Sequence, residues 1–164
     1  MAVTYTPIAT ATATGSQSEI LFTNISQAYT DLVVVVQATE SGSDGMDMRV
    51  GGSGGIDAGN NYSFTVLRGQ SGSASSYRVS DYSSVELGQV NSTQNILIAH
   101  VMNYSNTTTY KTVIGRENNA DVRVAARVSV WRNTSAITQL SFKNGSYVNH
   151  TAGSTFSLYG ILKA

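Results

Sequence analysis

Apolar and polar residues alternate along much of this chain with a period of two. In the stretch 153–162, Phe156 and Leu158 fall on one face, while Ser157 and Tyr159 fall on the other. A pleated strand imposes this period, and no stretch of about 11 residues has the helical period instead. The pattern therefore predicts an all-β protein.

Two stretches are apolar on both faces. Leu32–Ala38 contains four consecutive valines, and Asn95–Met102 is interrupted only by His100. Short, β-branched, continuous apolar runs are typical of central strands that are covered on both sides. We expect two such strands, with His100 as a hydrogen-bonded core histidine in line with Ile96 and Ile98.

The most regular alternation lies between residues 122 and 131. Valine and alanine occupy the even positions, and Arg123, Arg127 and Trp131 share the other face. One face must pack on the core while the other meets solvent or a partner. Trp and Arg are frequent interface anchors, so we predict a basic and aromatic patch that binds a partner. A tryptophan that covers a sheet edge beside solvated arginines is the alternative.

Residues 1–18 are rich in threonine and alanine. β-Branched threonines favour extended backbone, so we predict an extended N-terminal arm whose Tyr5, Pro7 and Ile8 contact a partner. An edge strand and a disordered tail are the alternatives, because polar terminal segments are often loose.

A long connection rich in serine and glycine is expected between Gly69 and Ser84. It carries Tyr77 and Tyr82 and little else that is apolar. Loops beyond about 12–15 residues are usually functional or mobile. We therefore assign both tyrosines to the candidate interface.

These segments predict a single-domain antiparallel β-sandwich. Eight or nine short strands are separated by turns rich in Gly, Asn and Ser, and Asn144–Gly145 is a strong hairpin signal. A chain of 164 residues fits one domain. We expect a jelly-roll-like sandwich over residues 19–164, preceded by the arm at 1–18.

Charge and composition limit the classes of molecule that this protein is expected to bind. Ten basic and ten acidic residues cancel, and only 12% of residues are charged, which argues against nucleic acid as a partner. Low charge also removes the repulsion that keeps small proteins apart, as suits a protein that works in an assembly. Cysteine is absent. Neither a signal peptide nor a membrane span is recognisable, so no membrane partner is expected.

The sequence predicts no catalytic centre, cofactor or metal. The two histidines, His100 and His150, have no nucleophile motif near them, and the glycines at 51–55 lack the Gly-Lys-Ser/Thr of a phosphate loop and indicate a hairpin instead. Glu40, Asp44 and Asp47 crowd one loop, where a calcium ion is the alternative to solvated acids.

Six motifs are spread along the chain: Tyr5–Ile8, Ile20–Ile25, Tyr29–Leu32, Tyr110–Thr112, Trp131–Ile137 and Ala152–Ile161. Together they resemble a group of small structural proteins of tailed bacteriophages that are found on virions of environmental phages. The resemblance spans the whole chain. It implies an all-β virion component with no catalytic residues to carry over, and the lack of a recognisable signal peptide predicts synthesis in the host cytoplasm.

Three functions follow from these expectations. The first is a capsid decoration or cement protein that binds the major capsid protein and further copies of itself, with a trimer favoured, and stabilises the shell. The second is a tail, baseplate or fibre component that binds a glycan through exposed tyrosines. The third is a non-viral binding module or an enzyme.

Overall fold

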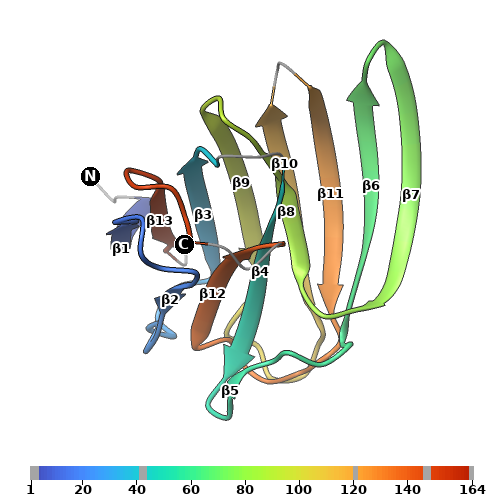
Figure 1. The fold of residues 1–164 in the computed structure, drawn as a ribbon. Helices are drawn as coiled ribbons and strands as arrows, with labels where there is room; N and C mark the ends of the chain where they lie inside the picture. Colours follow the sequence, from blue (N-terminus) through green and yellow to red (C-terminus); the bar gives the residue numbers. More distant parts are fainter. Residues whose placement is uncertain (1–3, 41–43, 120–121, 146–148, 163–164) are drawn as a thin grey trace.

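The computed structural model describes residues 4–40, 44–119, 122–145 and 149–162, and within them every regular element is a strand. Two antiparallel sheets face one another (Figure 1). The prediction of an all-β antiparallel sandwich is confirmed. The described residues contain no helix that is long and apolar enough to cross a bilayer.

The large sheet contains eight strands, and the chain's two terminal strands pair at one side of it. Its order is β1 (Tyr5–Thr12), β13 (Thr155–Ile161), β3 (Asp31–Ala38), β9 (Asn95–Met102), β10 (Lys111–Asn119), β11 (Arg123–Trp131), β6 (Tyr62–Gln70) and β7 (Ser73–Tyr82).

The small sheet contains five strands and covers one face of the large sheet (Figure 1). Its strands are β2 (Ile20–Phe22), β12 (Gln139–Asn144), β4 (Asp44–Gly52), β5 (Gly55–Ile56) and β8 (Val85–Val90), with β5 and β8 both paired to β4. The predicted glycine-rich hairpin is the turn between β4 and β5.

The core lies between the sheets, because alternate residues of each strand point inward. In β3, Leu32, Val34 and Val36 are buried, and in β4, Met48 and Val50 are buried. Apolar burial of this kind contributes about 25 cal/mol per Å² and is the main force that holds two sheets together. Both stretches predicted as central strands, β3 and β9, are interior strands of the large sheet.

The N-terminal arm that the sequence predicts is an edge strand instead. Residues 5–12 form β1 and pair with β13 from Tyr5 opposite Ile161 to Thr12 opposite Thr155. Ile8 packs against the core. The backbone hydrogen bonds of β13 and the apolar contact of Ile8 thus hold a segment whose composition also suits a free arm.

The connection predicted at 69–84 is also wrong, because ten of its residues form β7. Ser71 and Gly72 make a tight two-residue turn with φ of 51° and 76°, which is the geometry of a type I′ hairpin. Strand β7 then pairs with β6 along its length. Serine and glycine here form a solvated edge strand.

The last strand depends on one glycine. A Cβ on Gly160 would lie 2.3 Å from the ring of Tyr29, and Tyr29 packs against the core. The absent side chain therefore lets the Tyr29 ring lie flat on β13.

We predict that Gly160→Ala lowers the free energy of unfolding by about 1–3 kcal/mol, because the added methyl group displaces the Tyr29 ring. Urea unfolding measures this change. Gly54→Ala is the matched control, since nothing lies within 4 Å of a Cβ at Gly54. Equal losses in the two variants would contradict this account of Gly160.

Candidate binding surface

The large sheet presents apolar residues to solvent on the face that points away from the small sheet. We call this the outer face. Its residues alternate with the buried ones, so that Val124 is exposed while Ala125 is buried. Its central part consists of Ile96, Ile98, His100 and Met102 on β9, Ile114 and Arg116 on β10, Val124, Ala126, Val128 and Val130 on β11, and Leu67 on β6.

The exposed fractions show how unusual this face is. Leu67 is 62% exposed, Val124 is 53% exposed and Val128 is 51% exposed. Single exposed apolar residues are common on soluble proteins, but a contiguous apolar patch marks a surface that is covered by a partner. The outer face is therefore the strongest candidate for a functional surface.

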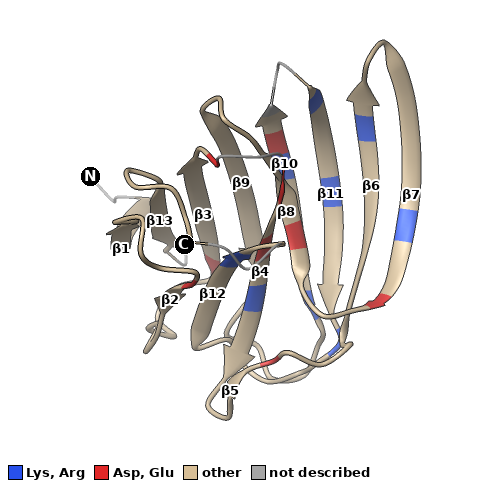
Figure 2. Ribbon diagram, viewed as in Figure 1, with Lys and Arg blue, Asp and Glu red and all other residues tan. Residues whose placement is uncertain are grey.

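Charged residues are sparse on the outer face. Strands β1, β9 and β13 contain no Lys, Arg, Asp or Glu (Figure 2). Arg116, on β10, stands between Ile98 and Ala126 in the register of the sheet. Its neighbours on both adjacent strands are thus apolar.

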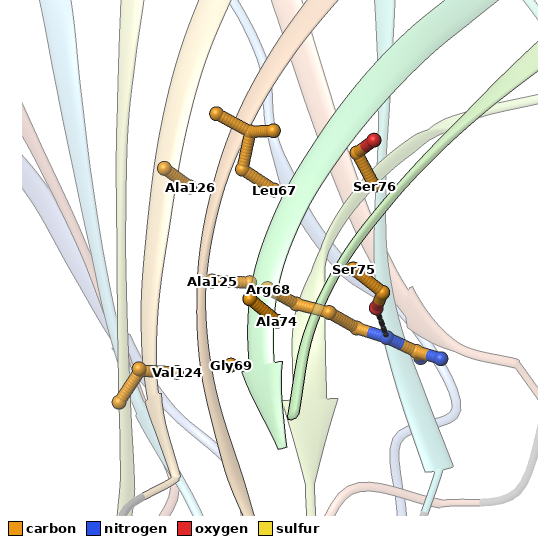
Figure 3. Close-up of a pocket in the computed structure, with 9 residues that line it drawn as sticks. All are labelled: Leu67, Arg68, Gly69, Ala74, Ser75, Ser76, Val124, Ala125 and Ala126. Atoms are coloured by element: carbon orange, nitrogen blue, oxygen red, sulfur yellow. Dashed lines mark hydrogen bonds between the residues drawn. The ribbon is translucent and has the colours of Figure 1, made fainter. Parts of the chain in front are cut away.

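A shallow, open depression of about 760 Å³ lies where β6, β7 and β11 present small residues (Figure 3). Leu67 and Val124 stand beside it, and Gly69, Ala74 and Ala126 leave space between them. Figure 3 shows Leu67 and Arg68 pointing to opposite sides of β6. The walls of the depression are mainly apolar, and Arg68, Ser75 and Ser76 form its polar part, so an inserted apolar side chain suits it better than a polar small molecule.

A second hollow of about 420 Å³ lies nearer the middle of the outer face. Asp31, His100 and Arg116 line it together with Ile114 and Met102. The prediction of His100 as a core residue is wrong, because the even positions of β9 point outward and the imidazole is only half-buried. His100 belongs to the outer face.

The inner face of β10 and β11 carries buried charges. Arg127 Nη1 lies 2.9 Å from Glu117 Oε2, and Arg123 Nε lies 2.5 Å from Glu117 Oε1. Both arginines also contact Glu86 of β8, at 3.1 Å for Arg127 and 3.4 Å for Arg123. This ionic cluster is held between the sheets.

Local packing builds a place for the Glu117 carboxylate. Its Oε2 accepts a hydrogen bond of 2.7 Å from the amide of Gln89. A Cβ on Gly88 would lie 2.2 Å from the same oxygen. The glycine therefore allows the small sheet to approach the cluster closely.

The predicted basic and aromatic surface patch is wrong as a consequence. Arg123, Arg127 and Trp131 all point inward, and their side chains are nearly inaccessible. Their carboxylate partners come from strands that are distant in sequence, so the pattern of residues 122–131 alone gives no sign of them. The valines of β11 occupy the exposed face instead.

Trp131 has a structural role at the other end of β11. Its Nε1 donates a 2.8 Å hydrogen bond to Asp57 Oδ2. Partial burial acts to raise the pKa of Asp57, but hydrogen bonds from Trp131, Asn61 and the amide of Gly59 outweigh it and lower that pKa. The contact ties β11 to the loop between β5 and β6.

We predict that Glu117→Gln lowers the free energy of unfolding by about 3–5 kcal/mol, because two buried guanidinium groups then share the single carboxylate of Glu86. Chemical unfolding of the purified protein measures the loss. Asp81→Asn breaks the exposed ion pair with Arg132 and should change stability by less than about 1 kcal/mol. A Glu117→Gln loss as small as the control's would contradict this role.

The two tyrosines of the predicted connection lie on β7. Tyr77 is half-buried, its ring meets Phe64 edge-to-face, and Arg68 lies 5.4 Å from the ring centroid. Tyr82 is 39% exposed and also packs edge-to-face on Phe64. Both residues pack within the β6–β7 hairpin at the edge of the large sheet, and only Tyr82 presents much of its ring to solvent.

The predicted contacts of the arm are distributed along β1. Tyr5 is 49% exposed and Pro7 is exposed, whereas Ile8 is half-buried. The register of β1 shifts between Pro7 and Ala9. A proline and a bulge both interrupt an edge ladder, so this edge is poorly suited to accept a further strand.

The three acids considered for calcium have separate environments. Glu40 is buried, 3.4 Å from Nδ1 of His150, and Asp44 accepts a hydrogen bond from the amide of Gly45. Asp47 lies on β4 opposite Glu86. Across the described ranges, no cluster of three His, Cys, Asp or Glu residues is arranged to hold a metal ion.

Burial raises the pKa of Asp47 from 3.8 to about 6, and the nearby Glu86 adds to the effect. A carboxyl group whose pKa is higher in the folded state favours folding when it is protonated. The loss of folding stability that ionised Asp47 causes is therefore absent below about pH 4, grows between pH 4 and 6, and is constant above pH 6.

We predict that Asp47→Asn is more stable than the wild type at pH 7, by up to about 3 kcal/mol, and that the difference disappears below pH 4. Unfolding curves at pH 3.5, 5 and 7 measure this trend. A difference that stays constant with pH would contradict the assigned origin in Asp47 ionisation.

The chain matches no protein-family model, and a search of curated proteins gave no significant relative. The sequence did contain one sign of the candidate surface. The stretches 32–38 and 95–102 are apolar on both faces, which predicts that each face packs against another layer. The small sheet packs against one of these faces.

Proposed function

We propose that this protein is a structural component of a bacteriophage virion, and that it acts as a capsid decoration or cement protein. The observation that carries the proposal is the exposed apolar outer face around Leu67, Val124 and Val128. A surface of this kind needs a cover, and a protein that works inside an assembly has one permanently.

The phage resemblance supports the proposal through the structural positions of its motifs. Tyr5–Ile8 pairs with the end of Ala152–Ile161 in the β1–β13 ladder, and Tyr29 packs on Gly160. Trp131 anchors the loop at Asp57. These residues stabilise the fold, so the motifs are consistent with a shared architecture rather than a shared catalytic site.

The proposed mechanism is binding alone. A protein that binds only the assembled shell stabilises it by linkage, and repetition at symmetric positions multiplies a weak contact. The partners are the major capsid protein and further copies of this chain. Synthesis in the host cytoplasm and the virion surface as final location belong to the same proposal.

The long edge of β7 is a second surface available to the capsid partner. Its residues are mostly exposed, and none of the ten is a proline. An uncovered edge strand offers main-chain hydrogen bonds to a strand from another protein. In this proposal the edge of β7, rather than an N-terminal arm, contacts the capsid partner.

We also propose the jelly-roll description of the sandwich. Successive strands cross repeatedly between the sheets, since β2, β4, β8 and β12 belong to the small sheet while β3, β9 and β13 belong to the large one. Repeated crossing of this kind is typical of jelly rolls.

A tail, baseplate or fibre component is the second candidate, and the exposed ring of Tyr82 favours it as a stacking surface for a sugar. Tyr77 supports it less, because its ring already contacts Phe64 and Arg68.

Immunogold labelling of the virus that encodes this chain, together with mass spectrometry of purified particles, tests the proposal. We expect label spread over the head, at a copy number comparable to the capsid protein. Label confined to the tail would favour the second candidate. Absence of the chain from particles would contradict both.

A further inference from the structure

The outer face lacks a covering layer, and its dimensions indicate what could provide one. Eight strands about 4.8 Å apart, with three rows of outward side chains about 7 Å apart, give the whole outer face an area on the order of 700 Å², and its exposed apolar residues lie on β9, β10, β11 and β6. Each partner in a standard protein interface contributes about 800 Å². The face is thus large enough to form a stable interface by itself.

Two charged residues on this face are placed so that they cannot meet within one chain. Arg116 lies in the same row as Ile98 of β9, which pairs with Val35 of β3. Asp31 is four residues before Val35 and two strands away from Arg116, so their Cα atoms are roughly 17 Å apart. This distance exceeds the combined reach of the two side chains.

The midpoint between these charges falls on His100. This residue lies on the intervening strand, β9, and pairs with Val33, midway between Asp31 and Val35. Asp31, His100 and Arg116 line the same hollow. Consider a two-fold axis that lies in the plane of the interface and passes over His100. If this axis is perpendicular to the line from Asp31 to Arg116, it places Arg116 of one copy opposite Asp31 of the other.

We propose that a second copy of this chain covers the outer face in a two-fold symmetric dimer. In a two-fold interface each residue pair occurs twice, so Asp31 and Arg116 form two ion pairs around the apolar contacts. The formal net charge of zero leaves no net repulsion between copies. This inference rests on the proposed function only in its premise that the face is covered in an assembly.

Asp31 keeps its structural contact in this arrangement. Its Oδ1 accepts a hydrogen bond from the amide of Asn103, and its second carboxylate oxygen remains available to an arginine. Face-to-face stacking at about 10 Å is also the ordinary way in which two sheets pack. The pair of copies would then form four layers of strands, with the two large sheets in contact around His100.

Sedimentation velocity of the purified full chain between about 1 and 100 μM tests the proposal, with the range set by ordinary affinities. We expect a dimer. Val128→Glu should weaken it at least about tenfold, because a buried unpaired carboxylate is unfavourable. Leu21→Glu is the matched control, since Leu21 is 48% exposed but belongs to the small sheet, and it should leave the dimer intact.

A charge exchange tests the two-fold arrangement itself. Arg116→Asp places two acids opposite each other, Asp31→Arg places two arginines opposite each other, and each should weaken the dimer about tenfold or more. The double variant restores opposite charges and should regain at least part of the affinity. Circular dichroism and the unfolding midpoint show whether each variant is folded.

Three results would overturn the proposal: a monomer at 100 μM, a trimer, or a dimer that is indifferent to both Val128→Glu and the charge exchange. The test is independent of location in the virion. If the chain dimerises but is absent from virus particles, the dimer is supported and the proposed function is contradicted. If the chain is monomeric but present on the capsid, the proposed function is supported and the dimer is contradicted.

Discussion

The small sheet covers only one side of a large sheet whose interior strands are apolar on both sides, and this imbalance dominates the molecule. The inner residues of β3 and β9 build the sandwich core. On the outer face, Ile96 and Met102 of β9 join Leu67, Ile114 and Val128 in an exposed apolar surface. A free sandwich would carry polar residues there. The sequence thus specifies a fold that exposes a contiguous apolar surface.

The ionic cluster between the sheets is linked to the same feature. On β11, the arginines face inward and the valines face outward, which reverses the usual arrangement. Glu86 and Glu117 make this possible, because they supply buried carboxylates for both guanidinium groups. Lys111 is likewise buried, with its Nζ donating to the carbonyl groups of Thr109 and Thr134. Both arginines and Lys111 thus have internal partners, although Arg127 Nε and Ser129 Oγ have none among the described residues.

Strand positions were predictable where side chains alternate, and orientation was not. The period of residues 122–131 defines a strand, but it does not show which set of alternating residues faces the core. The hydrophobic effect alone would place the valines in the core. The distant partners Glu86 and Glu117 decide the outcome. Strand β7 was missed because serine and glycine usually signal loops, although the Ser71–Gly72 pair is a turn signal. The edge strand β1 has the same composition as a free arm, and only its pairing with β13 distinguishes the two.

The candidate surface was predictable in part. The doubly apolar stretches at 32–38 and 95–102 indicated two covers, but they could not show that the chain provides one of them. Leu67, Ile114 and Arg116 become neighbours only through the register of β6, β11 and β10. Among the predicted contact residues, Tyr5, Pro7 and Tyr82 are exposed, and the others are half-buried or buried. The candidate surface is therefore formed only by the tertiary structure.

Carbene footprinting of the free and assembled protein tests the central claim most directly, because the reagent labels exposed apolar side chains without regard to charge. We expect Leu67, Ile114 and Val128 to be labelled in dilute protein and protected in the assembled state, while Leu21 on the opposite side remains labelled. Equal labelling of the outer face in both states would contradict the claim that this face is covered.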